Sequence, residues 1–88
     1  MATKDAIKVI ESMRASAANK TEADMKSVCN GYGFDIWEGK NHTTYQHQKY
    51  PQLIGQWPRH RQVLPVYVRQ LIRRIDQLEA LEGDEENG

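Results

Sequence analysis

The chain has 88 residues, enough for one small domain, and its 12 basic and 12 acidic side chains cancel to a formal net charge of zero. A hydrophobic fraction of 39% and a charged fraction of 27% are typical of a soluble globular protein, and no apolar stretch approaches the length of a membrane span. The N-terminal residues lack the apolar core of a secretory signal. Cys29 is the only cysteine, which excludes an internal disulfide and a thiolate-rich zinc site, so we expect a reducing cytoplasm.

Two helices are expected at the start of the chain. Apolar residues at helical spacing predict the first helix over residues 4–17. Thr21 followed by Asp24 resembles a capping box and predicts the start of a second helix. Gly31 is expected to stop it, because glycine tolerates the left-handed conformation found after helix ends. The apolar faces are Ile7, Ile10 and Met13 in the first helix, and Met25, Val28 and Cys29 in the second.

Three strands are expected next, over residues 34–37, 42–48 and 53–57. Short connections between them favour an antiparallel meander. Pro58 is expected to end the third strand, because proline has no N–H to donate to a neighbouring strand. Alternation in the second strand puts His42 and Tyr45 on opposite faces, so His42 points outward if Tyr45 packs inward.

A last helix is expected to begin at Pro65 and to end at Gly83. Its apolar stripe is Val68, Leu71, Ile72, Ile75 and Leu78. The resulting order, α-α-β-β-β-α, predicts an α+β fold in which a three-stranded antiparallel sheet has helices packed on one face. We divide the chain into an N-terminal helix and linker (1–20), a main domain (21–82) and a disordered acidic tail (83–88).

A long segment of the chain is basic, although the whole chain is neutral. Residues 39–75 contain no Asp or Glu. The basic residues of this segment are Lys40, Lys49, Arg59, Arg61, Arg69, Arg73 and Arg74. A histidine among positive charges suggests binding or chemistry at a phosphate group.

Three short motifs resemble those of the HicA toxins of bacterial HicA–HicB toxin–antitoxin pairs. They are Gly-Tyr-Gly-Phe at residues 31–34, Gly-Lys-Asn-His at residues 39–42, and Pro-Arg-His at residues 58–60. A helix containing Tyr-Val-Arg-Gln-Leu at residues 67–71 follows, as in longer members of that family. The resemblance covers roughly Thr21 to Leu81, and Lys40 stands where the family usually has serine.

This resemblance implies a fold like the double-stranded-RNA-binding domain and the activity of a messenger-RNA-cleaving toxin, restrained by a HicB-like antitoxin. In that family the last histidine of the second motif is catalytic, which implies that His42 is the catalytic residue here. We expect no cofactor, no membrane association and a monomer when the antitoxin is absent.

The chemistry of the residues agrees with this role. An imidazole that titrates near neutral pH suits proton transfer in either direction, and Lys40 can stabilise phosphate charge. Arg59 and Arg61 are candidates for phosphate contacts, with a solvated loop as the nearly equal alternative. His60 either contacts RNA or caps its loop.

Other side chains have simpler interpretations. His47 is expected to be buried and hydrogen-bonded, and Trp57 is expected in the core, while Trp37 is a candidate for stacking on unpaired bases. The helix arginines Arg69, Arg73 and Arg74 are expected to be solvated, with extension of the basic track or contact with an acidic antitoxin as the alternatives. No metal site is predicted, since a divalent ion would need acids from outside the basic segment, such as Asp35 or Glu38.

Two other functions remain open on the sequence alone. One is an RNA-binding module of the same fold that does not cleave RNA. The other is a protein-interaction domain whose basic face docks an acidic partner, and a salt-sensitive interaction with RNA would count against it.

Overall fold

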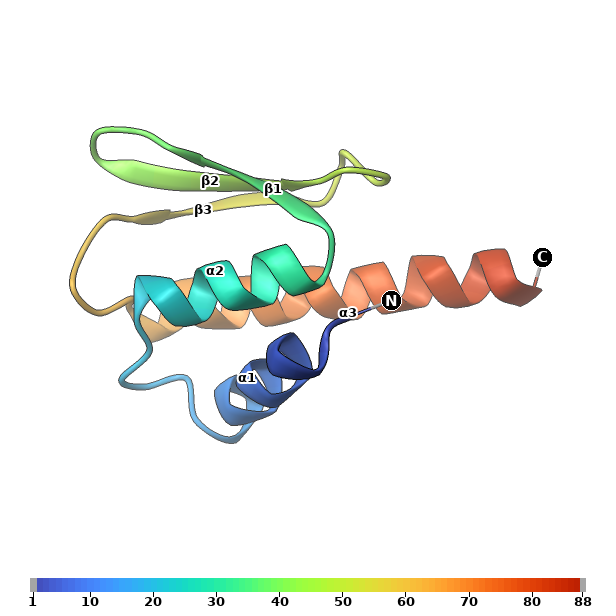
Figure 1. Cartoon of the computed structure of the whole chain (residues 1–88), viewed down its shortest axis with the longest axis horizontal. Coiled ribbons are helices and arrows are strands. Elements are labelled where there is room, and N and C mark those ends of the chain that lie inside the picture. The colour runs from blue at the N-terminus through green and yellow to red at the C-terminus, as the bar shows by residue number, and fades with distance from the viewer. Residues whose placement is uncertain (1, 88) are drawn as a thin grey trace.

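The computed structural model describes residues 2–87, with side chains described as far as Glu85. Its elements follow in the order α-α-β-β-β-α, so the predicted α+β fold is confirmed (Figure 1). The helices are α1 (Lys4–Ala15), α2 (Glu22–Gly31) and α3 (Pro65–Asn87), and the strands are β1 (Phe34–Glu38), β2 (His42–His47) and β3 (Ile54–Pro58).

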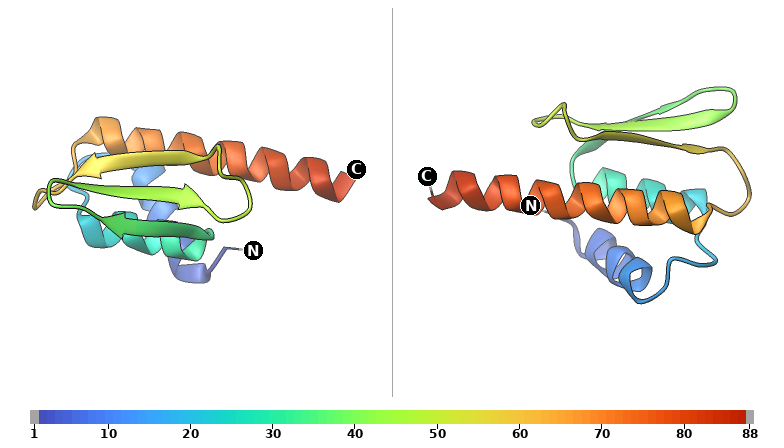
Figure 2. Two further views of the ribbon diagram at one scale, coloured as in Figure 1. Left: turned by 90° about the horizontal axis from the view of Figure 1, so that it is seen from above. Right: turned by 180° about the vertical axis from the view of Figure 1, so that it is seen from behind.

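The elements form layers. The sheet is antiparallel with the strand order β1-β2-β3. Helices α2 and α3 lie under one face of the sheet, and α1 packs against them on the side away from the sheet (Figure 1). Within the described residues, no helix covers the other face, which Figure 2 shows from above. The C-terminal half of α3 extends past the end of the sheet.

The second helix begins as its sequence predicts. The Thr21 hydroxyl accepts a hydrogen bond from the backbone N–H of Asp24 at 3.3 Å, and the Asp24 carboxylate accepts one from the backbone N–H of Thr21 at 2.9 Å. This capping box satisfies two backbone donors that have no partner within the helix. The first helix ends at Ala15, two residues earlier than predicted. Asn19 then adopts a left-handed conformation with φ of 59° in the link to α2.

The core lies between the sheet and the helices. The apolar face predicted for α2 is buried, and so is the stripe predicted for α3 except for Ile72, which is partly buried. Tyr45 and Trp57 point inward from β2 and β3 and are fully buried. The pairing of Tyr45 with Gly55 across these strands leaves room for the tyrosine ring, because a Cβ on Gly55 would lie 2.3 Å from the Tyr45 hydroxyl oxygen.

Helix α2 ends at Gly31 as predicted, but the left-handed conformation expected as the reason is not found there. Gly31 is the last residue of α2, and the left-handed residue after the helix is Gly33, with φ of +85°. Gly31 is instead a contact point between helices, because a Cβ there would lie 2.2 Å from the Cβ of Ala6 in α1. Glycine at this position therefore permits the close approach of α1 to α2.

The predicted end of the last helix is also wrong. Helix α3 continues through Gly83 to Asn87, so residues 83–87 of the expected disordered tail are helical, and Gly88 lies outside the described residues. A glycine inside a helix costs only about 1 kcal/mol relative to alanine, which neighbouring residues can offset. The ammonium of Lys49, after β2, pairs with the Glu85 carboxylate at 2.7 Å and links this end of the helix to the β2–β3 connection.

Candidate functional site

The turn between β1 and β2 determines where His42 lies. The backbone N–H of Gly39 donates to the carbonyl oxygen of His42 at 2.8 Å and closes the turn. Arg59 holds this turn from the other side. Its backbone N–H donates to the carbonyl oxygen of Asn41 at 2.9 Å, and its Nη1 donates to that of Gly39 at 3.2 Å. His42 is thus fixed as the first residue of β2, opposite Pro58 at the end of β3.

The side chain of His42 lies on the open face of the sheet. Along β2, Thr43, Tyr45 and His47 are buried beneath the sheet, whereas His42 is exposed. The orientation predicted from the alternation of β2 is therefore confirmed. An exposed imidazole at one end of the central strand, on a sheet face that no described helix covers, is accessible to a large polyanion.

The guanidinium of Arg59 already has partners within the protein. Its Nη2 lies 3.7 Å from a carboxylate oxygen of Glu38, and its Nε lies 4.0 Å from one of Glu22. Glu38 also pairs with Lys26, and this ammonium, followed by the Arg59 guanidinium, lowers the pKa of the Glu38 carboxyl. Two carboxylates and a carbonyl oxygen already engage the guanidinium, which reduces what it can offer to a phosphate.

Two acidic partners of Arg59, Glu22 and Glu38, are not predicted from the sequence. Both acids precede the basic segment, and neither has a motif that links it to Arg59. Glu22 is the first residue of α2, and Glu38 is the last residue of β1. Only the packing of α2 beneath the sheet brings the two carboxylates to one guanidinium.

Four predicted RNA-contacting residues surround one hollow. Lys40 from the β1–β2 turn and Arg59, His60 and Arg61 from the β3–α3 connection line a hollow of about 510 Å³ beside the first turn of α2. Lys40, His60 and Arg61 are exposed. His42 is not among the lining residues. It lies at the same end of the sheet, because its chain neighbour Asn41 accepts a hydrogen bond from the backbone N–H of Arg59 and its partner in β3 is Pro58.

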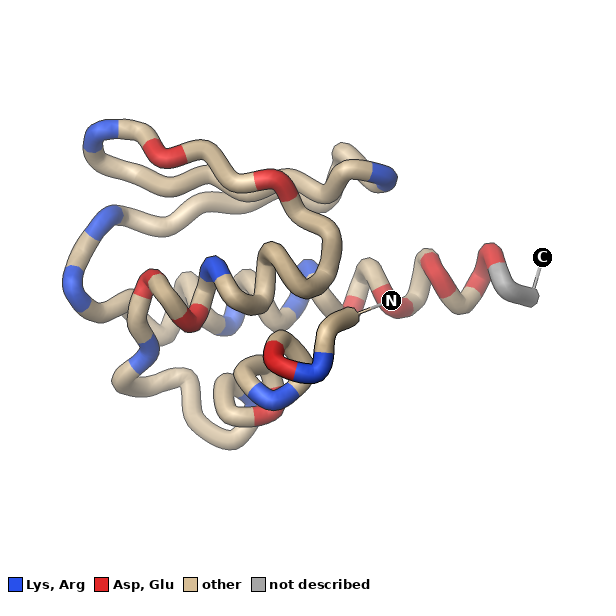
Figure 3. The backbone as a smooth tube through the Cα atoms, in the orientation of Figure 1, with Lys and Arg blue, Asp and Glu red and all other residues tan. Residues whose placement is uncertain are grey.

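The rest of the basic segment is spread over the molecule. Cationic residues occur at both ends of the sheet and along α3 (Figure 3). Arg74 donates from Nε to the carbonyl oxygen of Ile54 at 2.9 Å, which secures the edge strand β3 to α3. Lys49 is paired with Glu85, and this hydrogen bond raises the pKa of the Lys49 ammonium. The run of positive charge in the sequence is therefore not one continuous surface in the fold.

The other predicted roles of aromatic and histidine side chains are confirmed for His47 and Trp57. His47 Nδ1 accepts hydrogen bonds from the backbone N–H groups of Lys49 and Tyr50 at 3.1 and 3.2 Å. In the neutral ring the proton then belongs on Nε2, which lies 2.9 Å from the carbonyl oxygen of Tyr32. Trp57 is fully buried, whereas Trp37 is 52% exposed on the open face.

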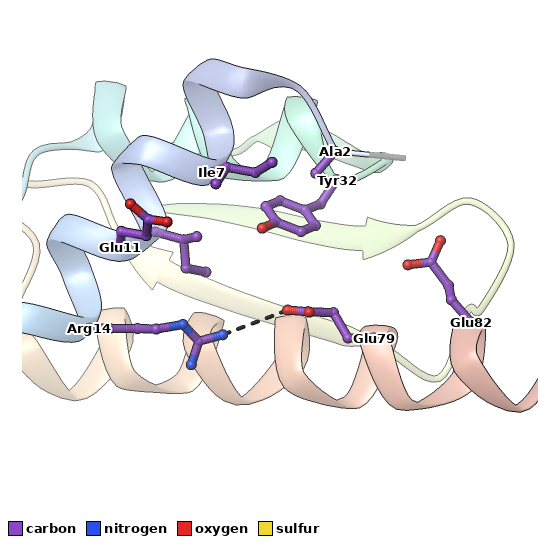
Figure 4. A pocket seen from close by; sticks show the side chains of 8 residues that line it. Ala2, Ile7, Glu11, Arg14, Tyr32, Glu79 and Glu82 are labelled. Carbon is purple, nitrogen blue, oxygen red and sulfur yellow. Dashed lines mark ion pairs between the residues drawn. The ribbon is translucent and has the colours of Figure 1, made fainter.

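A second hollow, of about 590 Å³, lies on the other side of α2 and α3, where α1 meets the second half of α3 (Figure 4). Arg14 spans it and lies 3.7 Å from Glu79 and 2.6 Å from Asp76. Burial, followed by the charge of Glu79, raises the pKa of Tyr32 in its wall. Its other acids, Glu11 and Glu82, make it an unfavourable place for a polyanion.

Comparison of the chain with protein-family models, curated proteins and solved structures finds no match. The similarity to HicA toxins therefore depends on the three sequence motifs alone. Among residues 2–87, no group of three or more His, Cys, Asp or Glu side chains is arranged to hold a metal ion. No helix in the same range is both long enough and apolar enough to cross a membrane.

Proposed function

We propose that this protein is a toxin-type endoribonuclease that cleaves messenger RNA, with His42 as its catalytic residue. The observation that carries the proposal is an exposed imidazole fixed at the start of β2, two residues after exposed Lys40 in the turn that lines a cationic hollow with Arg61. A proton-transfer group beside positive charge is the minimum that cleavage of a phosphodiester requires.

The reaction uses the nucleophile that RNA itself carries. His42 accepts the proton of a 2′-hydroxyl, and the O2′ atom attacks the adjacent phosphorus. A bond from O2′ to phosphorus forms while the bond from phosphorus to the O5′ of the next nucleotide breaks. O5′ takes a proton from water, and the hydroxide left behind takes up the proton that His42 holds. Lys40 stabilises the negative charge of the phosphorane. The products are a 2′,3′-cyclic phosphate and a 5′-hydroxyl end.

The rate that this arrangement supports is modest. A single positioned acid–base group contributes about 10²- to 10⁴-fold. Every step uses groups of the protein, the RNA or water, so we expect cleavage to persist in the presence of a chelator. A chelator that abolished cleavage would exclude this mechanism.

The resemblance extends the proposal to partners and location. A HicB-like antitoxin encoded by a neighbouring reading frame would bind the protein in the cytoplasm, and without it the protein would be monomeric. Co-expression of the two frames, followed by purification through a tag on one of them, tests this. The two chains should elute together and the free toxin should elute as a monomer.

The decisive experiment compares wild type with His42→Ala on purified messenger RNA. We expect His42→Ala to lose cleavage and to retain its fold and its RNA binding. Gln52→Ala is the matched control, because Gln52 is an exposed residue in the β2–β3 connection at the other end of the strand. Full cleavage by His42→Ala would refute the assignment.

A second candidate is an RNA-binding module that does not cleave. The exposed indole of Trp37 favours it, because an aromatic face can bind an unpaired base without any chemical step. The same experiment separates the two functions. Salt-sensitive binding with intact RNA in the wild type would establish the module.

A further inference from the structure

The open face of the sheet carries one exposed indole among polar side chains. Trp37 is 52% exposed, whereas Trp57 is fully buried. Trp37 of β1 lies opposite Thr44 of β2, and Thr44 lies opposite Gln56 of β3. Because directly opposed residues share a face, an indole, a hydroxyl and an amide form a row across the sheet. Figure 2 shows this side of the sheet uncovered.

His42 lies next to this row. It precedes Thr44 by two positions in β2, so the two side chains point the same way. Diagonal cross-strand neighbours on one face are about 7–8 Å apart, which places the imidazole beside the indole of Trp37. An extended RNA strand with one base on the indole would have its adjacent phosphate near the imidazole.

Charge is distributed unevenly along this face. The end with the β1–β2 turn carries exposed Lys40, and Arg61 lines the same hollow. Toward the other end, Asp35 is exposed and accepts a hydrogen bond from Gln48 Nε2 at 2.7 Å. The cation at that end, Lys49, is paired with Glu85, so the end with the β1–β2 turn attracts a sugar–phosphate backbone more strongly. A backbone bound at this end would pass over His42, with its bases directed along the sheet.

We infer that Trp37 is a stacking platform for one unpaired base next to the phosphate at His42, and that it makes single-stranded RNA the preferred substrate. This inference rests on the proposed function. Stacking on an aromatic ring stabilises binding of any base, because every base has a π-face. Thr44 and Gln56 supply a hydroxyl and an amide for the edge of that base.

Duplex RNA does not fit this platform. Inside an A-form helix both faces of each base are covered by its neighbours, so the indole finds no free face. Duplexes are recognised mainly by shape and by contacts to phosphates and 2′-hydroxyls. The platform thus selects unpaired RNA, although the resemblance implies a fold like that of duplex-binding domains.

Tryptophan fluorescence tests the inference, because Trp37 is exposed to a ligand and Trp57 is not. The His42→Ala protein, which should leave RNA intact, is titrated with short oligoadenylate and with the same strand annealed to its complement. We expect the single strand to quench tryptophan emission and to bind more tightly than the duplex. Equal affinity for both, or an unquenched indole with the single strand, would overturn the inference.

Variants in the same His42→Ala background sharpen the test. Trp37→Ala should weaken oligoadenylate binding roughly 5- to 150-fold and leave duplex binding little changed. Trp37→Phe keeps an aromatic face and should retain most of the affinity. Ile7→Ala removes an exposed apolar side chain from α1, on the side of the helices away from the sheet, and should have no effect. Undiminished binding by Trp37→Ala would refute the platform.

This test separates failure of the platform from failure of the nuclease. Quenching by oligoadenylate in a wild-type protein that cleaves nothing would support the platform and refute the nuclease. Cleavage by the wild type, with Trp37→Ala unchanged in cleavage and in binding, would support the nuclease and refute the platform. If neither RNA binds, the platform is refuted, and binding of a protein partner is the alternative role for the open face.

Discussion

Glu22 and Trp57 are joined by a hydrogen bond in which the indole Nε1–H donates to a carboxylate oxygen at 3.1 Å. This bond connects the first turn of α2 to the last strand of the sheet. The same oxygen lies 4.0 Å from Nε of Arg59, the residue that holds the turn before His42. The carboxylate of Glu22 thus connects buried Trp57 to Arg59, which stabilises the turn of the candidate site.

The first prediction concerns this carboxylate. Glu22→Ala should lower the free energy of unfolding by about 1–3 kcal/mol, because it leaves the indole N–H of buried Trp57 without its partner. Urea unfolding followed by circular dichroism measures the change. Glu22→Gln retains an acceptor oxygen and should keep most of the stability. An unchanged unfolding midpoint in Glu22→Ala would show that this hydrogen bond contributes nothing to the free energy of unfolding.

A second prediction concerns the tyrosine in the core. Within the described residues, the Tyr45 hydroxyl is buried without a hydrogen-bond partner, a burial that costs free energy. Tyr45→Phe should therefore raise the free energy of unfolding by up to about 1 kcal/mol. Gly55→Ala should lower it by about 1–3 kcal/mol, because the added methyl group meets the tyrosine ring. Thermal unfolding that ranked these two variants in the opposite order would contradict the packing of the Tyr45 ring against Gly55.

A third prediction is the loss of stability at alkaline pH. Burial raises the pKa of the Cys29 thiol in the folded protein. Above the ordinary thiol pKa of about 8.5, the unfolded chain releases this proton while the folded protein keeps it. The unfolded state then binds fewer protons, so the free energy of unfolding falls by about 1.4 kcal/mol per pH unit.

Urea unfolding of wild type and Cys29→Ala between pH 8 and pH 10 measures this contribution. The variant should be less stable at neutral pH, because it leaves a small cavity, but its stability should decline less with pH. The free energy lost to the cavity is the same at every pH, so it does not affect the comparison of the two slopes of unfolding free energy against pH. Parallel slopes for the two proteins would show that the thiol does not contribute.

A fourth prediction separates the cations around the turn. In the His42→Ala background, Lys40→Ala and Arg61→Ala should each reduce the salt dependence of oligoadenylate binding by about 0.7 in the logarithmic slope, if each contacts one phosphate. Arg59→Ala should reduce it less, because Glu22 and Glu38 already engage that guanidinium. Binding measured over a range of salt concentrations gives the three slopes. Equal reductions would mean that Arg59 exchanges its carboxylate partners for phosphate.

The sequence by itself determined the features that depend on local periodicity and local chemistry. Alternation along β2 sets the direction of His42 as soon as Tyr45 is assigned to the core, because the period of a strand is two residues. Thr21 and Asp24 cap α2 through contacts three residues apart. Pro65 begins α3 because its ring suits a first helical position.

The tertiary structure alone decided which distant groups meet. Glycine is needed at position 31 so that α1 can approach closely, and not in order to end α2. Helix α3 continues through Gly83. Arg59 gains two carboxylate partners that precede it in the chain by many residues, and the positive charges of one continuous segment separate to opposite ends of the sheet. Such contacts depend on the packing of layers, and packing between residues far apart in the chain leaves no periodic signal in the order of the amino acids.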